Sequence, residues 1–290
     1  MPRLAKNRSI IFKGMKVMRG MLGIGVVLMF LASCNFGKPE TKVEPDIFTD
    51  TVLYEMKTIR ERAKDCSTGP DSTCTMAEIS YPVFKGQDAL NDTLKNRLLN
   101  LGANGDEKPD SSFQTMISTF FKSYEEYKKD DERKNIAFDL QEYAQVVNQD
   151  SCLIAIRYGT YSFSGGAHGS GFDAFINWNP KTKKVVYLND ILLPNSEKEL
   201  NIIGERIFRK DEKLADNASL EQDYFFKDNK FALNENYLFT PTGIRFLYNE
   251  YEIKPYVAGQ TELNIPWAQL RTLIKPHSVV AQYIEKNAGI

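Results

Sequence analysis

The sequence predicts an α+β protein with two lobes, in which antiparallel sheets carry helices packed on one face. Three observations support this class: helical periodicity over residues 90–124, strand-like alternation over 136–188, and a second set of short helices and strands after residue 196. Runs of helices that are separate from runs of strands are typical of α+β proteins. We expect an N-terminal lobe over residues 51–190 and a C-terminal lobe over residues 191–290.

The N-terminal lobe begins with a strand pattern over residues 74–84, where Pro82 indicates a strand edge or end. Two helices are expected next. The first presents a leucine face, and the second, over residues 113–124, carries apolar and aromatic side chains at i, i+3, i+4 and i+7. This aromatic stripe is typical of a core face, although a ligand surface or a surface for a partner helix would show the same spacing. The leucine face consists of Leu90, Leu94, Leu98 and Leu101.

Residues 136–188 predict an antiparallel meander. Residues 153–163 are β-branched and aromatic, and their pattern changes side at Gly159, which indicates a bulge or a bend. Residues 172–178 alternate between apolar and more polar side chains, and a turn at 179–183 leads into one more strand.

The C-terminal lobe opens with a helix. Ser196 and Glu199 have the spacing of a capping box at its start. Strands over 237–240 and 244–248 flank a Pro-Thr-Gly turn and form a hairpin, a further strand covers 261–265, and short helices are expected around Leu270 and Val280.

The N-terminus has the layout of a bacterial lipoprotein signal peptide over residues 1–33. Six cations and no acid precede an apolar run of 11 residues at 21–31, and Leu-Ala-Ser-Cys then ends at Cys34. An apolar helix needs about 20 residues to span a bilayer, so cleavage is favoured over a permanent anchor. We expect the Cys34 thiol to accept a lipid and residues 34–50 to form a flexible tether. The alternative is an ordinary secretory signal with an incidental cysteine.

Removal of residues 1–33 would leave 31 Lys and Arg against 38 Asp and Glu, a net charge of −7. This balance is a poor match for nucleic acid. We therefore expect no nucleic-acid partner, and we expect membrane attachment through the lipid alone. We expect the protein to be extracytoplasmic and lipid-anchored, at the cell membrane or the outer membrane.

Three further cysteines could form disulfides in an oxidising compartment. Cys66 and Cys74 flank a turn-forming segment, so a disulfide between them is expected, with two free thiols as the alternative. Cys152 begins an apolar run and is expected to be buried. Neither His168 nor His277 lies at ligand spacing from these cysteines, so we expect no metal site and no cofactor.

Two segments resemble the PdaC/RsiV-like extracytoplasmic module, a domain family largely of unknown function. The first is YSFSGGAHG at residues 161–169, followed by YLNDI at 187–191. The second is GIRFLYNEYEIKPYVAG at residues 243–259, followed by LNIPWAQL at 263–270. The resemblance spans roughly residues 75–275.

The resemblance implies two α+β lobes, the second similar to a small piece of the actin-like ATPase fold. In deacetylases that carry the module, catalysis belongs to a separate metal-dependent domain. In anti-sigma factors the module is an extracellular sensor that binds lysozyme, whereas a separate cytoplasmic segment holds the sigma factor. The resemblance therefore implies binding, and it supports neither catalysis nor a sigma-binding role here.

The candidate binding residues are Tyr161, His168, Tyr251 and Tyr256, because aromatic faces suit both sugars and protein interfaces. The plain alternative is a tight glycine-rich connection at 165–169 and a packed surface loop at 251–256. No catalytic residue is assigned.

We expect a non-enzymatic cell-envelope lipoprotein that binds peptidoglycan-type glycan or a protein such as lysozyme. The alternative is an envelope glycan hydrolase or deacetylase-like enzyme, in which His168 would act with a carboxylate such as Asp173 or Glu252. The sequence does not predict an oligomeric state.

Overall fold

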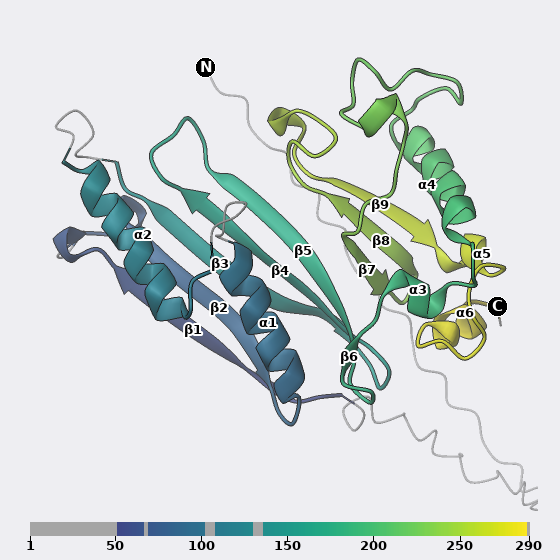
Figure 1. The fold of residues 1–290 in the computed structure, drawn as a ribbon, viewed down its shortest axis with the longest axis horizontal. Helices are drawn as coiled ribbons and strands as arrows, with labels where there is room; N and C mark the ends of the chain where they lie inside the picture. Colours follow the sequence, from purple (N-terminus) through teal and green to yellow (C-terminus); the bar gives the residue numbers. More distant parts are fainter. Residues whose placement is uncertain (1–50, 67–68, 102–107, 130–135, 289–290) are drawn as a thin grey trace, which may run out of the picture. The chain divides into compact units, whose positions relative to one another are not determined.

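A six-stranded sheet forms the first half of the fold (Figure 1). The computed structural model describes residues 51–66, 69–101, 108–129 and 136–288. The predicted signal peptide, Cys34 and the tether lie outside the described residues. The strands lie side by side in chain order: β1 (Tyr54–Arg62), β2 (Met76–Phe84), β3 (Asp139–Gln149), β4 (Ile154–Phe163), β5 (Ser170–Asn179) and β6 (Lys184–Val185).

One pair of neighbouring strands is parallel, which corrects the expectation of purely antiparallel sheets. β2 pairs parallel with β3 over Met76–Ser80, and the other neighbours pair antiparallel. Parallel neighbours require a crossover connection. Here the crossover contains both α1 (Asp88–Leu101) and α2 (Phe113–Tyr127). Pro82 in β2 lies beyond the β3 pairing, so its missing N–H interrupts no bond to β3.

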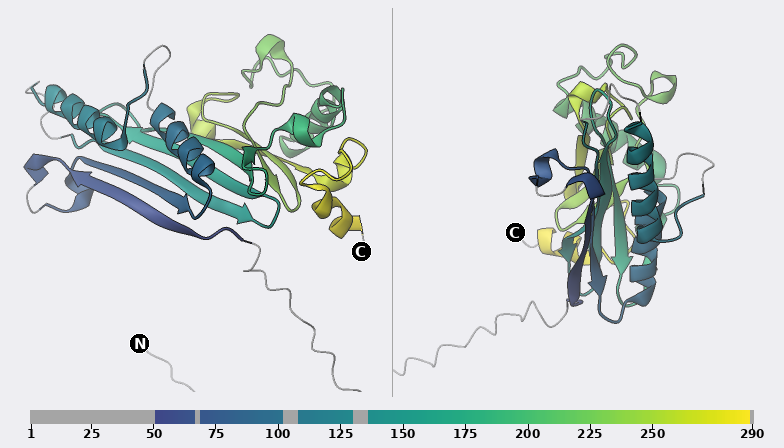
Figure 2. Two further views of the ribbon diagram at one scale, coloured as in Figure 1. Left: turned by 60° about the horizontal axis from the view of Figure 1, so that its bottom comes forward. Right: turned by 90° about the vertical axis from the view of Figure 1, so that its left-hand side faces the viewer.

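Helices α1 and α2 cover one face of this sheet (Figure 2). The leucine face of α1 packs on alternate residues of β4 and β5, which point to the helix side because side chains alternate along a strand. The α2 helix begins after Ser112, whose hydroxyl accepts a hydrogen bond from the Thr115 amide at 3.1 Å. The aromatic stripe of α2 is therefore a core face. Its buried residues are Phe113, Met116, Ile117 and Tyr124.

The sequence analysis missed β1. This strand reads YEMKTIRER and is mostly exposed, so it lacks the apolar alternation that identifies a strand. It lies at the edge of the sheet and pairs with β2 along all nine of its residues. Charged side chains are common on edge strands because they oppose pairing with other chains.

The bulge expected at Gly159 is not present, because β4 keeps a regular register with β3 and β5 across this residue. The irregularity lies instead in β3, between Val146 and Asn148. A Cβ at position 159 would lie 2.7 Å from Asp173 Oδ1 and 2.9 Å from Tyr143 Oη. Glycine is required here because a hydrogen bond between those two side chains passes over its backbone.

A buried carboxyl group lies on the helix side of the sheet. Glu142 is 2% exposed, pairs with Thr160 in the β3–β4 ladder, and has one carboxyl oxygen without a partner. Burial raises the pKa of Glu142 to about 8, although a hydrogen bond with the Thr160 side chain acts in the opposite direction. Glu142 is therefore mostly protonated at neutral pH.

A three-stranded antiparallel sheet forms the second half, as the sequence predicts. Its strands are β7 (Tyr237–Thr240), β8 (Gly243–Tyr248) and β9 (Thr261–Pro266). The second hydrophobic core joins this sheet to α3 (Leu188–Ile191), α4 (Glu197–Asp211), α5 (Trp267–Leu270) and α6 (Ala281–Ala288). The expected capping box is not formed, because Ser196 has helical backbone angles and makes no side-chain cap bond.

The two sheets belong to one compact unit. Among the described residues, no helix is both long and apolar enough to cross a membrane.

Candidate functional site

The connection between β4 and β5, residues 164–169, presents His168 to solvent. Its imidazole Nδ1 lies 2.8 Å from the Gly169 carbonyl oxygen. The Tyr161 ring lies directly against the buried Gly169, where even a Cβ atom would collide with it. Glycine at 169 therefore lets the tyrosine ring close over the loop.

A second loop, residues 249–259, follows β8 and carries Tyr251 and Tyr256. Its base is closed by the Glu252 carboxylate, which accepts hydrogen bonds from the Asn249 amide at 2.8 Å and from Asn234 Nδ2 at 2.6 Å. Tyr251 has a φ of +65° and a side chain that is 58% exposed. Positive φ costs a non-glycine residue on the order of 1 kcal/mol, and such strain is concentrated at functional sites.

The two loops meet, and this contact brings all four predicted binding residues together. The His168 ring stacks on the Tyr256 ring, with centroids 4.0 Å apart and planes 19° apart. Tyr251 lies 5.5 Å from Tyr256 and 6.5 Å from His168 between ring centroids. The Tyr256 hydroxyl donates to the Gly169 carbonyl at 3.1 Å. We call Tyr161, His168, Tyr251 and Tyr256 the aromatic cluster.

The cluster offers exposed aromatic faces and hydroxyl groups. Desolvation, followed by the nearby Glu250 carboxylate, raises the pKa of Tyr256 above its ordinary value. Val257 follows Tyr256 directly and is 93% exposed. The cluster can therefore stack on a ligand and donate hydrogen bonds to it.

Within the described residues, the His168 imidazole has a hydrogen-bond contact with the Gly169 carbonyl and none with a carboxylate that could support acid–base chemistry. Asp173 is instead occupied by other groups: Arg157 Nε and Nη2 each donate to it at 2.6 Å, and Gln260 Nε2 donates at 2.8 Å. Glu252 is held by its own loop, as described above.

Asp173 is the centre of a buried hydrogen-bond network on the side of the sheet opposite the helices. It is 4% exposed and also accepts a hydrogen bond from Tyr143 Oη at 2.6 Å. Burial alone would raise the pKa of Asp173, but the hydrogen bonds from Arg157, Tyr143 and Gln260 outweigh it and hold this pKa below its usual value. Because Gln260 comes from the segment before β9, the network helps to fix the second loop against the first sheet.

Three asparagine side chains, two of them buried, join β5 to the second sheet. Asn177 donates to the Tyr237 carbonyl at 3.0 Å and accepts from the Phe239 amide at 2.7 Å. Asn236 Nδ2 donates to the Asp173 carbonyl at 2.8 Å, and Asn249 bonds both backbone groups of Asp173. Sequence analysis did not single out these residues, because an isolated asparagine carries no signal for a partner about 60 or more positions away.

The expected disulfide is not formed, because Cys66 and Cys74 are both free thiols. Their side chains are in hydrogen-bonding contact, and burial, followed by that contact, raises the pKa of Cys66. Arg62 Nη2 donates to Cys74 Sγ at 2.9 Å and to the Gly69 carbonyl at 2.5 Å, so polar contacts close this turn without a covalent bond. Cys152 is also free and is half-buried rather than buried.

Across the described residues there is no group of three or more His, Cys, Asp or Glu side chains that could hold a metal ion.

Two family models match adjoining parts of the chain. The model described as Deacetylase PdaC matches residues 69–171, and the model described as Protein of unknown function (DUF3298) matches residues 189–268. The first loop of the aromatic cluster therefore lies in one match and the second loop in the other.

Peptidoglycan-N-acetylmuramic acid deacetylase PdaC of Bacillus subtilis is 21% identical to this chain over 216 residues. The match covers 72% of this chain but only 40% of that protein.

Two crystal structures of DUF3298 family proteins have the same fold, each with a TM-score of 0.63. The protein from Pseudomonas aeruginosa is 23% identical, and the match covers 78% of this chain and 96% of that one. The protein from Bacteroides fragilis is 22% identical, and the match covers 82% of this chain and 99% of that one.

Proposed function

Because this chain carries a PdaC/DUF3298-like extracytoplasmic module, we propose that it is a non-catalytic, lipid-anchored binding protein of the cell envelope whose aromatic cluster binds peptidoglycan-type glycan. The observation that carries the proposal is the stacking of His168 on Tyr256 beside the exposed ring of Tyr251. Flat aromatic faces with hydroxyl groups suit sugar rings, which have apolar C–H faces and polar edges. The similarity to a peptidoglycan deacetylase supports this class of polymer.

The hydrogen bonds that the nearby carboxylates already make support a binding surface over a catalytic centre. A general base must lie within hydrogen-bond reach of its partner or be bridged to it by one water. The carboxylates suggested for this role, Asp173 and Glu252, already accept several hydrogen bonds from other groups. An assay for fragments or acetate released from peptidoglycan, run with wild type and His168→Ala, tests the enzymatic alternative. Turnover that His168→Ala abolishes would overturn the non-catalytic proposal.

Co-sedimentation of the detergent-purified full chain with insoluble peptidoglycan tests the glycan proposal. Tyr251→Ala removes an exposed ring with little effect on packing, and Tyr256→Ala removes the stacking partner of His168. We expect each change to weaken binding about tenfold, because stacked aromatic contacts contribute on the order of 1 kcal/mol or more. Ile202→Ala, which truncates an exposed side chain on α4, is the matched control and should bind like wild type. Unchanged binding by both tyrosine variants would refute the proposal.

A protein such as lysozyme is the second candidate ligand, and the 93% exposure of Val257 favours it. Burial of an exposed aliphatic side chain in an apolar pocket of a protein is favourable, whereas the edge of a sugar presents polar hydroxyl groups. Val257→Asp separates the two candidates. It should abolish binding to a protein partner, measured by calorimetry with lysozyme, and leave peptidoglycan co-sedimentation unchanged.

A further inference from the structure

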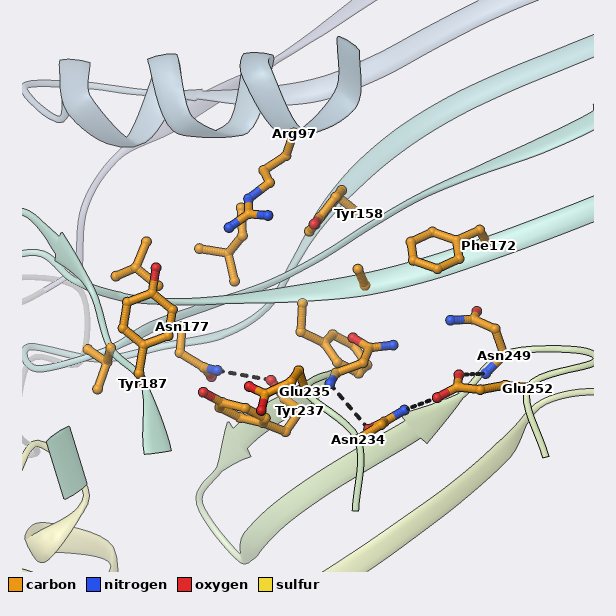
Figure 3. A pocket seen from close by; sticks show the side chains of 16 residues that line it. Arg97, Tyr158, Phe172, Asn177, Tyr187, Asn234, Glu235, Tyr237, Asn249 and Glu252 are labelled. Carbon is orange, nitrogen blue, oxygen red and sulfur yellow. Dashed lines mark hydrogen bonds between the residues drawn. The ribbon is translucent and has the colours of Figure 1, made fainter. Parts of the chain in front are cut away.

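A cavity of about 490 Å³ lies beside β5 (Figure 3), and none of the four residues of the aromatic cluster lines it. Its walls come from α1, β4, β5, the segment before α3 and the segment before β7. Volumes of this size are typical of small-molecule sites. We call it the Arg97 cavity, because Arg97 supplies its cation.

The Arg97 guanidinium extends from α1 into the cavity (Figure 3). It is in hydrogen-bonding contact with the Tyr158 hydroxyl, which leaves most of its five N–H donors free. Within the described ranges it makes no ion pair with any carboxylate. Arginine binds carboxylates through two parallel hydrogen bonds, so this group is suited to an anionic ligand group.

Two carboxylates also line the cavity, and they differ in whether they can accept a hydrogen bond from a ligand. Glu252 accepts hydrogen bonds from the Asn249 amide in its own loop and from the Asn234 side chain before β7, so both of its oxygens have partners. Glu235 is exposed on the wall opposite Arg97 and forms no ion pair with it (Figure 3). A ligand between the two walls would meet a hydrogen-bond donor at Arg97 and an acceptor at Glu235.

Two exposed aromatic rings complete the cavity. Phe172 and Tyr187 lie at opposite ends of it and are 41% and 53% exposed (Figure 3). Large exposed apolar side chains that line a cavity are typical of ligand sites. A cation, an acceptor and two flat apolar faces together match a sugar ring that carries an acidic group.

We propose that the Arg97 cavity binds a carboxylate-bearing saccharide unit. Arg97 binds the carboxylate, Glu235 accepts from a ring hydroxyl, and Tyr187 or Phe172 packs on the apolar face of the ring. This inference rests on the proposed function for the class of polymer, but it assigns a site separate from the aromatic cluster.

A pair of sugars tests the role of Arg97. N-acetylmuramic acid and N-acetylglucosamine differ only in the lactyl group that carries the carboxylate. With the detergent-purified full chain, titrated by ligand-observed NMR, we expect N-acetylmuramic acid to bind about tenfold more tightly, because charge-assisted hydrogen bonds are the strong ones. Arg97→Gln should remove this preference. Lys95→Gln, on the same helix but outside the cavity, should retain it. Equal binding of the two sugars by wild type, or a preference that survives Arg97→Gln, overturns the proposal.

Two further measurements distinguish a saccharide site in the Arg97 cavity from a general carboxylate site and from the aromatic cluster. The dipeptide Ala-Ala carries a carboxylate without a sugar, and if it bound as tightly as N-acetylmuramic acid, the saccharide assignment would be wrong. Tyr256→Ala removes a ring of the aromatic cluster and should leave the preference for N-acetylmuramic acid intact. Failure of the aromatic cluster to bind peptidoglycan is therefore distinguishable from failure of the Arg97 cavity.

Discussion

The side chain of Asn249 pairs with the backbone of Asp173 through both of its polar atoms. Its Oδ1 accepts a hydrogen bond from the Asp173 N–H at 2.8 Å, and its Nδ2 donates to the Asp173 carbonyl at 3.0 Å. Asn249 thus occupies the position that a neighbouring strand would take at the edge of β5. Both residues are buried, so the hydrogen bonds are shielded from water.

Asn249→Ala should lower the free energy of unfolding by about 2 kcal/mol, because it leaves both backbone groups of Asp173 with fewer partners in a buried setting. Chemical denaturation followed by circular dichroism measures this change. Asn264→Ala is the matched control, since that side chain accepts a single exposed bond from Arg245 at 3.3 Å. The control should change stability by less than about 0.5 kcal/mol. Equal effects of the two substitutions would contradict the interpretation of Asn249 as a link between the sheets.

Gly159→Ala should destabilise the protein by several kcal/mol or prevent folding, because the new methyl group would collide with the Phe172 carbonyl and the Tyr143–Asp173 hydrogen bond. Gly171→Ala, on the adjoining strand β5, is the control. Its added methyl group would lie 3.8 Å from the Thr160 carbonyl oxygen, an ordinary contact. Thermal unfolding of the two variants should therefore differ by many degrees, and similar melting temperatures would show that β4 can shift to relieve the clash.

Glu142 should make the protein less stable as pH rises from about 4.5 to about 8. Its pKa in the folded state, about 8, lies above its unfolded value, so over this interval the folded state holds a proton that the unfolded state has lost. Stability is then fully present below the unfolded pKa and decreases with rising pH until the folded pKa is passed. Glu142→Gln should remove this dependence and be more stable than wild type at pH 8, by on the order of 3 kcal/mol.

Urea denaturation at pH 5 and pH 8 measures the effect of Glu142. Glu78→Gln is the control, because that carboxylate is partly exposed and paired with Arg60 at 3.2 Å. A pH dependence that persists unchanged in Glu142→Gln would show that another group is responsible.

Cys34→Ser should abolish acyl attachment, because the serine hydroxyl does not replace the thiol that accepts the lipid. Metabolic labelling with a palmitate analogue checks this in cells. Cys152→Ser is the matched control and should remain labelled, since Cys152 belongs to the folded body. Continued labelling of Cys34→Ser would refute the lipoprotein assignment.

The sequence predicted those elements whose signals are local. The hairpin of β7 and β8 was predicted almost to the residue, because alternating strands flank a short turn. The α2 helix was predicted from its apolar spacing, and the residues that it buries in the structure follow that spacing. β1 was missed, because an edge strand held by backbone hydrogen bonds needs no apolar pattern.

The sequence did not predict how the four candidate binding residues are arranged, and their binding role stays a prediction. Residue type alone identified Tyr161, His168, Tyr251 and Tyr256, and the fold brings them together across about 80 positions of sequence. Gly159 was noticed, but its role depends on the side chains that cross it, which come from two other strands. A requirement for glycine that arises from side chains on two other strands cannot be detected in the local sequence pattern.

The edge of β5 has a consequence for how the chain can be divided. β5 continues from the end of the PdaC match at residue 171 to residue 179, before the DUF3298 match begins at residue 189. A fragment that ended near residue 190 would keep β5 but lose Asn236 and Asn249, so its unpaired N–H and C=O groups would face solvent. Exposed strand edges recruit other chains. The first half should therefore be expressed together with the second, since on its own it would be prone to self-association through the edge of β5.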